Sequence, residues 1–210
     1  MRSKKSLSEP IARALDILSG NINVSIPGRV EAYDAAKQRA SVKPLIKRKY
    51  IDGEVEGMPV IDGVPVVFPR SGGAAVTMPV HEGDGVLLIF ADRSIDRWLV
   101  QGGEVEPDDR RKHDLSDCIA VPGLVSFPDA DGHDDDGVVV GYKGGARAKF
   151  HESGQVAIGT DAEELLALVS ELLEALVNTT TATSIGMQPL TEAETFAILK
   201  ERLDGIKGAL

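Results

Sequence analysis

The residues best suited to chemistry stand in the stretch DRRKHDLSDCIAVPGL, residues 109–124, where His113 is followed directly by Asp114. With Asp109 and Asp117 nearby, this pair could form an acid–base site, because such catalysis uses an imidazole oriented by a carboxylate. Neighbouring side chains diverge on regular structure, however, so a carboxylate directly after its histidine is poorly placed to orient it. No G-x-S-x-G motif accompanies the pair. We therefore interpret the stretch as a charged loop that enters a buried strand, with no catalytic residue.

A second polar stretch, DADGHDDDG at residues 129–137, offers carboxylates and a histidine that could hold a metal ion. Its spacing does not fit a calcium-binding EF-hand loop, which requires glycine at the sixth position and glutamate at the twelfth. We predict a solvated linker here. His81 and His151 stand alone, and the sequence has no phosphate-binding or dinucleotide-binding glycine motif, so we predict neither a metal nor a cofactor.

The chain contains one tryptophan and one cysteine. Trp98 lies near Ile95 and Leu99, and with them it is most simply an anchor of the core. An exposed indole would instead favour stacking on a carbohydrate. Cys118 stands in an apolar strand, where a thiol is normally inert, and as a single cysteine it forms no intrachain disulfide.

Composition narrows the class of protein. A chain of 210 residues with 42% hydrophobic and 27% charged residues suits a soluble globular protein. The formal net charge of -10 opposes general nucleic-acid binding, which needs a basic field, and we interpret the basic cluster at residues 43–49 as a solvated strand end. The N-terminal MRSKKSLSEPIARALDILSG indicates an amphipathic helix and not a signal peptide. No stretch approaches the roughly 20 apolar residues that span a membrane.

The predicted secondary structure differs between regions of the chain. We predict an N-terminal helix within residues 1–21. Residues 22–127 contain short β-branched runs punctuated by glycine and proline, which favour a small barrel or sandwich over a βαβ fold. Within them we predict a hairpin around YDAAKQ and tight turns at Asp62-Gly63, at Gly72-Gly73 and at residues 82–85. An OB-fold barrel is the most economical architecture.

Residues 128–160 combine the acidic linker with three short strand candidates, which cannot bury a core alone and need the barrel or other copies of the chain. Residues 161–210 are predicted to be helical, with an interruption at NTTTATSIGMQPL and a restart at a capping box formed by Thr191 and Glu194. The apolar spacing of three and four suits a coiled-coil seam, and both an antiparallel helical hairpin and a trimeric bundle remain open. The candidate trimer-interface residues are Leu165, Val169, Leu172, Leu176, Phe196, Leu199 and Leu203.

Three stretches in order, PGRVEAYDAAKQRASVKPLIKR, MPVIDGVPVVFPRSGGAAVTMPVHEGDGVLLIFADRSIDRW and DRRKHDLSDCIAVPGL, carry a family resemblance. The region of about residues 25–127 resembles the N-terminal domain of bacteriophage baseplate central spike proteins, the membrane-piercing needles of contractile-tailed phages. The resemblance implies an OB-fold collar, a homotrimer around the tail axis and a short intertwined β-stem, in a mainly β chain with helical termini. It places the protein in the virion, at the contractile tail baseplate. It also gives the His113 segment a scaffold role.

The implied partners are the tail hub and other baseplate proteins, with transient contact to the host envelope and no nucleic acid. The C-terminal part of the chain differs from that of the family members. Family members commonly end in a long β-helix and an apex whose His-x-His pairs bind iron, whereas this sequence has no His-x-His and ends in predicted helices. We therefore expect a shortened spike or hub without bound iron that carries or docks a separate tip protein.

Two alternatives belong to other classes of protein. One is a monomeric OB-fold binding module for carbohydrate or single-stranded nucleic acid, which the aromatic content of 4% and the negative charge disfavour. The other is a cell-wall hydrolase built around His113. It is disfavoured because no insert is large enough for a lysozyme domain and no pair of catalytic carboxylates stands out.

Overall fold

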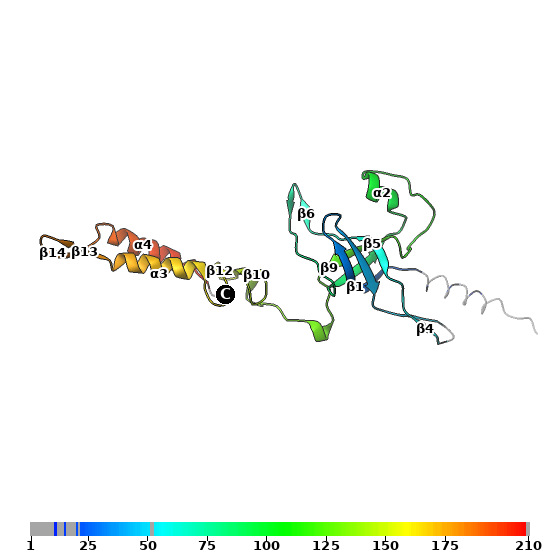
Figure 1. Ribbon diagram of the computed structural model, residues 1–210, viewed down its shortest axis with the longest axis horizontal. Helices are drawn as coiled ribbons and strands as arrows, with labels where there is room; N and C mark the ends of the chain where they lie inside the picture. The colour runs from blue at the N-terminus through cyan, green and yellow to red at the C-terminus, as the bar shows by residue number, and fades with distance from the viewer. Residues whose placement is uncertain (1–10, 12–14, 16–19, 21, 51–52, 209–210) are drawn as a thin grey trace, which may run out of the picture. The chain divides into compact units, whose positions relative to one another are not determined.

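The computed structural model describes residues 11, 15, 20, 22–50 and 53–208. It divides into two compact units, Met1–Ala130 and Asp131–Leu210, whose elements are shown in Figure 1. The helix expected within residues 1–21 lies largely outside the described residues. None of the described helices is long and apolar enough to cross a membrane.

The first unit is built around a curled five-stranded sheet in which all neighbouring strands are antiparallel. The strands, in the spatial order β5-β2-β1-β8-β9, are β1 (Ser25–Asp34), β2 (Arg39–Pro44), β5 (Ile61–Pro65), β8 (Gly85–Phe90) and β9 (Cys118–Pro122). A parallel bridge between Val66 and Ala120 joins the two edges of the sheet, and the Val67 N–H donates to the Ala120 carbonyl at 3.0 Å. The result is an OB-like barrel, which confirms the predicted fold class for this region.

Alternating residues of these strands fill the interior of the barrel. The fully buried apolar side chains belong to Val30, Val42, Val86, Leu88 and Cys118. Strand β1 crosses close to this core at Gly28, where an added Cβ would lie 2.7 Å from a methyl group of Val42. The absence of a side chain at Gly28 therefore permits the close packing of β1 over the core.

Two short hairpins project from the barrel. One pairs β3 (Arg48–Lys49) with β4 (Val55–Glu56), and the other pairs β6 (Arg70–Ser71) with β7 (Ala74–Ala75). The second hairpin turns at Gly72-Gly73, as predicted, and both glycines have positive φ. The tight turn predicted at Asp62-Gly63 is wrong. These residues lie inside β5, where the register against β2 shifts at a β-bulge that Gly63 accommodates with φ of 71°.

A long connection between β8 and β9, residues 91–117, carries the short helix α2 (Asp96–Gln101). We call this connection the β8–β9 loop. After β9, the 3₁₀-helix η1 (Phe127–Asp129) ends the first unit.

The second unit joins a small sheet to a pair of helices. The sheet, in the order β10-β11-β12, comprises β10 (Gly137–Gly141), β11 (Arg147–His151) and β12 (Val156–Gly159). Helices α3 (Leu165–Val177) and α4 (Ala193–Asp204) are joined by a hairpin of β13 (Thr180–Thr183) and β14 (Gly186–Pro189). The segment after α4 returns to the sheet, where Lys207 forms a parallel bridge with Val156.

Contacts between the helices show how they run. Ser170 bonds to Asp204, and Glu174 lies 3.9 Å from Lys200, so residue numbers rise on α3 as they fall on α4. Within one chain the helices therefore form an antiparallel pair, visible in Figure 1. The predicted capping box at Thr191 is wrong, because α4 begins after Glu192 without any side-chain cap. Helix α3 is capped instead by Glu164, whose carboxylate accepts the first free N–H groups.

Candidate functional site

Arg111 organises the charged stretch that first suggested chemistry. Its guanidinium donates to both oxygens of Asp117, from Nε at 2.6 Å and from a terminal nitrogen at 3.0 Å, and it also pairs with Asp96 and Asp109. Asp117 is completely buried and accepts a further bond from the Ile95 N–H at 2.9 Å. Its hydrogen bonds to Asp117, and then to Asp96, raise the pKa of Arg111 above its ordinary value. This cluster ties the separate parts of the β8–β9 loop together at Asp117, the residue directly before β9.

His113 and Asp114 do not form the acid–base pair. The His113 Nδ1 lies 3.1 Å from the carbonyl oxygen of Asn23, and its Nε2 lies 3.4 Å from a carboxylate oxygen of Asp92. Asp114 instead accepts hydrogen bonds from the hydroxyl and the N–H of Ser116, which lower the pKa of its carboxyl group. With φ of 50° at His113 and a bond from the Asn23 amide to its carbonyl, the residue is a fixed corner of the loop.

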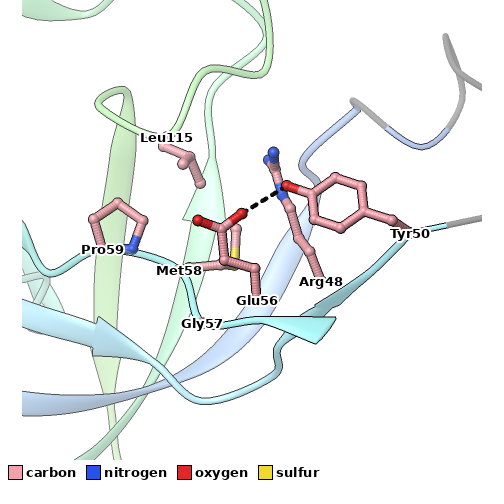
Figure 2. Close-up of a pocket in the computed structure, with 7 residues that line it drawn as sticks. All are labelled: Arg48, Tyr50, Glu56, Gly57, Met58, Pro59 and Leu115. Carbon is pink, nitrogen blue, oxygen red and sulfur yellow. Dashed lines mark hydrogen bonds between the residues drawn. The ribbon is translucent and has the colours of Figure 1, made fainter. Parts of the chain in front are cut away.

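A small pocket lies where the β3–β4 hairpin approaches the β8–β9 loop. Figure 2 shows the Tyr50 hydroxyl pointing at Glu56, to which it donates at 2.9 Å, and this bond raises the pKa of Tyr50. Met58, Pro59 and Leu115 line the apolar side. The pocket measures about 80 Å³, whereas pockets for small ligands typically measure about 300–1,000 Å³. It therefore has room for a few water molecules and not for a substrate of ordinary size.

Trp98 is not the core anchor that the sequence predicts. Its side chain is 50% exposed on α2, and that of Val100 is 82% exposed. The ion pair between Arg111 and Asp96 and the bond from the Ile95 N–H to Asp117 tie the start of this helix to the end of the β8–β9 loop. Because the attachment is polar, it leaves the indole at the surface.

Cys118 lies fully buried at the start of β9, in the apolar strand that the sequence predicts. Burial raises the pKa of its thiol to about 11. The thiol is therefore protonated near neutral pH and shielded from reagents, as expected for a structural cysteine.

The acidic stretch at the start of the second unit is not simply the solvated linker that we predict. Asp134 and Asp136 lie 2.8 and 2.7 Å from the ammonium group of Lys149, whose side chain is only 9% exposed. A hydrogen bond with Asp136 and the contact with Lys149 lower the pKa of Asp134 to about 2. The two carboxylates therefore hold the ammonium group of Lys149 on one face of the β10-β11-β12 sheet.

The opposite face of that sheet is wholly apolar. The register aligns Val138 with Phe150 and Val156, and Val140 with Ala148 and Ile158. Val138 is 64% exposed, and Val140, Phe150 and Ile158 are also exposed. We call these six residues the apolar sheet face. This face is absent from the candidate sites predicted above, although the alternation of apolar residues about Lys149 in RAKFH indicates it.

Helix α3 presents apolar residues on two sides. Leu166, Ser170, Leu173 and Val177 are buried or half-buried, at spacings of four, three and four. Leu165, Leu168, Val169 and Leu172 are exposed, and we call them the outer seam of α3. Of the candidate interface residues on α4, Leu199 is exposed whereas Phe196 and Leu203 are half-buried, as is Leu176 on α3.

No metal-binding cluster gathers at any of these places. Within the described part of the chain, no group of three or more histidine, cysteine, aspartate or glutamate residues lies close enough together to hold a metal ion.

The described residues thus form an OB-like barrel with a charged loop between β8 and β9, and a second unit that exposes several large apolar side chains. Comparison with known families shows that residues 26–123 match the model described as the phage protein Gp138 N-terminal domain. Over these residues, just under half of the chain, the protein carries the N-terminal domain of this phage baseplate protein family, which confirms the resemblance seen in the sequence. It is a bacteriophage structural protein and a virion component. No curated protein matches the chain.

Proposed function

We propose that the protein forms a homotrimeric central spike or hub on the axis of a contractile-tail baseplate, where it helps the tail penetrate the host envelope. The observation that carries this proposal is the uncovered apolar surface of the second unit, made by the apolar sheet face and the outer seam of α3. Its partners in this role are the tail hub, other baseplate proteins and a separate tip protein.

The second unit needs partner surface to be stable. A small sheet without a packed face is only marginally stable, yet the polar face here is closed by Lys149 and its two aspartates while the apolar face stays open. Burying each large apolar side chain contributes about 1.5–3 kcal/mol. Copies of the chain around a common axis would cover the open face and the outer seam of α3 together. A threefold arrangement is the one that the family resemblance favours.

The proposed role is structural and not catalytic. The contacts of His113 support this, since both ring nitrogens face groups that hold the β8–β9 loop in place. The helical pair ends in the β13–β14 hairpin, where Ile185 and Met187 are exposed, and this end offers a place for a tip protein.

Light scattering on the purified full chain tests the oligomeric state, and three chains per particle are expected. Electron microscopy of tails labelled with an antibody against the chain tests its location, with label expected at the distal end of the tail on the axis. A monomer in solution at micromolar concentration, or label along the sheath, would overturn the proposal.

A further inference from the structure

Two features of the barrel unit expose apolar side chains at the surface of a single chain. The first is a groove of about 550 Å³ where the β1–β2 turn meets the segments that flank the β6–β7 hairpin. Met78 in the groove is 47% exposed. The lining residues with apolar surface include Tyr33, Ala35, Ala36, Phe68, Met78 and Pro79.

The second feature is the knob formed by Trp98 and Val100 on α2. Both side chains are exposed, yet the backbone that carries them is held firmly. Arg97 pairs with Asp108 at 2.5 Å, and Arg111 joins the start of the helix to buried Asp117. A tryptophan presented on a fixed platform loses little conformational freedom when it is buried, and tryptophan is enriched among the residues that dominate protein interfaces.

The knob and the groove are separate in a single chain, because no residue of α2 lines the groove. In Figure 1, α2 lies at one side of the sheet, and the β6–β7 hairpin that flanks the groove lies at the other. A chain therefore cannot place its own Trp98 in its own groove. A second chain, rotated about a common axis, can do so, and each chain then offers its groove to the next.

Acidic side chains lie near the knob, and a basic side chain lies beside the groove. Glu104 and Glu106 are exposed in the β8–β9 loop a few residues after the knob. Arg70 donates to Gln38 of the groove lining at 2.8 Å, whereas Lys37 in the adjoining turn is already paired with Asp34 at 3.1 Å. Complementary charge of this kind favours one register between two copies and disfavours others.

We propose that Trp98 and Val100 of one copy dock into the groove between Tyr33 and Met78 of the next copy. The two surfaces differ, so the contact is head to tail, and such a contact forms a closed ring when the rotation between copies closes. This inference rests on the proposed homotrimer and assigns the contact that joins its barrels.

Trp98 is the only tryptophan, so intrinsic fluorescence of the full-length protein reports this contact directly. In the assembled protein we expect emission at shorter wavelength and loss of most acrylamide quenching, relative to free N-acetyltryptophanamide. Met78→Glu and, separately, Ala36→Glu should restore red-shifted, readily quenched emission, because each changes the groove that the neighbour's Trp98 would occupy. Val55→Glu, a change at an exposed valine of the β3–β4 hairpin, is the matched control and should leave the spectrum unchanged.

A covalent test uses the burial of Cys118, which keeps the native thiol away from exposed introduced cysteines. The double variant Val100→Cys with Ala36→Cys should give disulfide-linked trimers on mild oxidation. The control double variant Val100→Cys with Val55→Cys should give no more disulfide-linked product than the single variants do.

The outcomes separate this inference from the proposed function. A trimer in which Trp98 stays as quenchable as the free compound overturns the ring contact and leaves the homotrimer standing. The contact is also overturned if Trp98 is shielded from acrylamide and stays equally shielded in Met78→Glu and Ala36→Glu. Shielding that appears only when a soluble peptidoglycan fragment is added would assign the indole to a sugar and overturn the contact. A monomer overturns the proposed function itself.

Discussion

The two units of this chain reach stability in different ways. The barrel encloses its own core, with Val30, Val42, Val86 and Leu88 completely buried between strands of the same chain. In the described part of the second unit, Ala157 is the only apolar residue in the buried class, while longer apolar side chains of its sheet and helices remain exposed. The barrel therefore has a core of its own, whereas the second unit exposes most of its large apolar side chains in the single chain.

The two units also differ in how a buried charged side chain is paired. In the barrel, Asp117 is sealed under the guanidinium of Arg111, with planar, paired hydrogen bonds. In the second unit, Lys149 is sealed under two aspartates that precede the sheet in sequence. The first arrangement holds the β8–β9 loop together at the residue that precedes β9. The second lies on one face of a sheet whose other face is exposed in the single chain.

The largest effect that would sharpen this comparison is expected from Leu172→Asp on the outer seam of α3. The leucine is 59% exposed in one chain, so the change costs little in a monomer. In a trimer it places like charges near the axis and removes about 1.5–3 kcal/mol of burial in each copy. Light scattering should show monomers or a loosened second unit, while circular dichroism shows the barrel still folded.

Thr195→Asp, at an exposed polar position of α4, is the matched control for that change and should remain trimeric. If Leu172→Asp keeps three chains per particle and the wild-type melting temperature, α3 does not lie at an interface between copies.

The next effect belongs to the barrel. Asp117→Ala leaves Arg111 facing an apolar gap and removes the acceptor of the Ile95 N–H, so we expect a loss of about 3 kcal/mol in the free energy of unfolding. Asp109→Ala removes an exposed partner of the same Arg111 and should cost no more than about 1 kcal/mol. Urea denaturation of both variants measures the difference, and equal losses would show that burial of Asp117 does not govern the attachment of the loop.

A smaller effect is expected from acid. The folded pKa of Asp134 is about 2, below the ordinary value of 3.8, so its contribution to stability is complete above about pH 4. That contribution is lost as the pH falls from about 4 toward 2. The melting temperature of the second unit should drop over this range, and Asp134→Asn should show a weaker drop. An identical pH profile for both proteins would show that the Asp134 contact with Lys149 is not stabilising.

The smallest effect is expected from His113→Ala. The change removes the ring contacts to Asn23 and Asp92, both partly exposed, so it should lower the free energy of unfolding by at most about 1 kcal/mol. A peptidoglycan-degradation assay on both proteins should find no activity that depends on His113. Activity present in the wild type and absent from the variant would contradict a structural role.

The barrel was largely predictable because its strands alternate with period two around glycine turns. The hairpin predicted around YDAAKQ is confirmed as β1–β2, in which Val30 pairs with Val42. The bulge at Asp62-Gly63 was missed, since a glycine with positive φ serves a tight turn and a bulge equally well. The exposure of Trp98 was not predicted. Its residue type indicates an apolar side chain, but it does not indicate that charged groups hold the helix that carries it.

The candidate interface was predictable only in part. Spacing of three and four marks Leu165 and Leu172 as apolar positions on α3, and both are exposed in a single chain. The same spacing marks Leu176 and Phe196, which are half-buried instead. A helix with apolar residues on two sides satisfies several heptad registers at once, so the sequence alone does not tell which side meets its own chain.

The return of the chain to the sheet after α4 has a consequence for protein engineering. Because Lys207 pairs with Val156, both ends of the helical excursion are tied to the same small sheet. Whole helical turns added in step to α3 and α4 would change its reach without altering either attachment. A foreign peptide grafted at Ser184-Ile185, in the turn of the β13–β14 hairpin, would likewise be displayed at the far end of a natural scaffold.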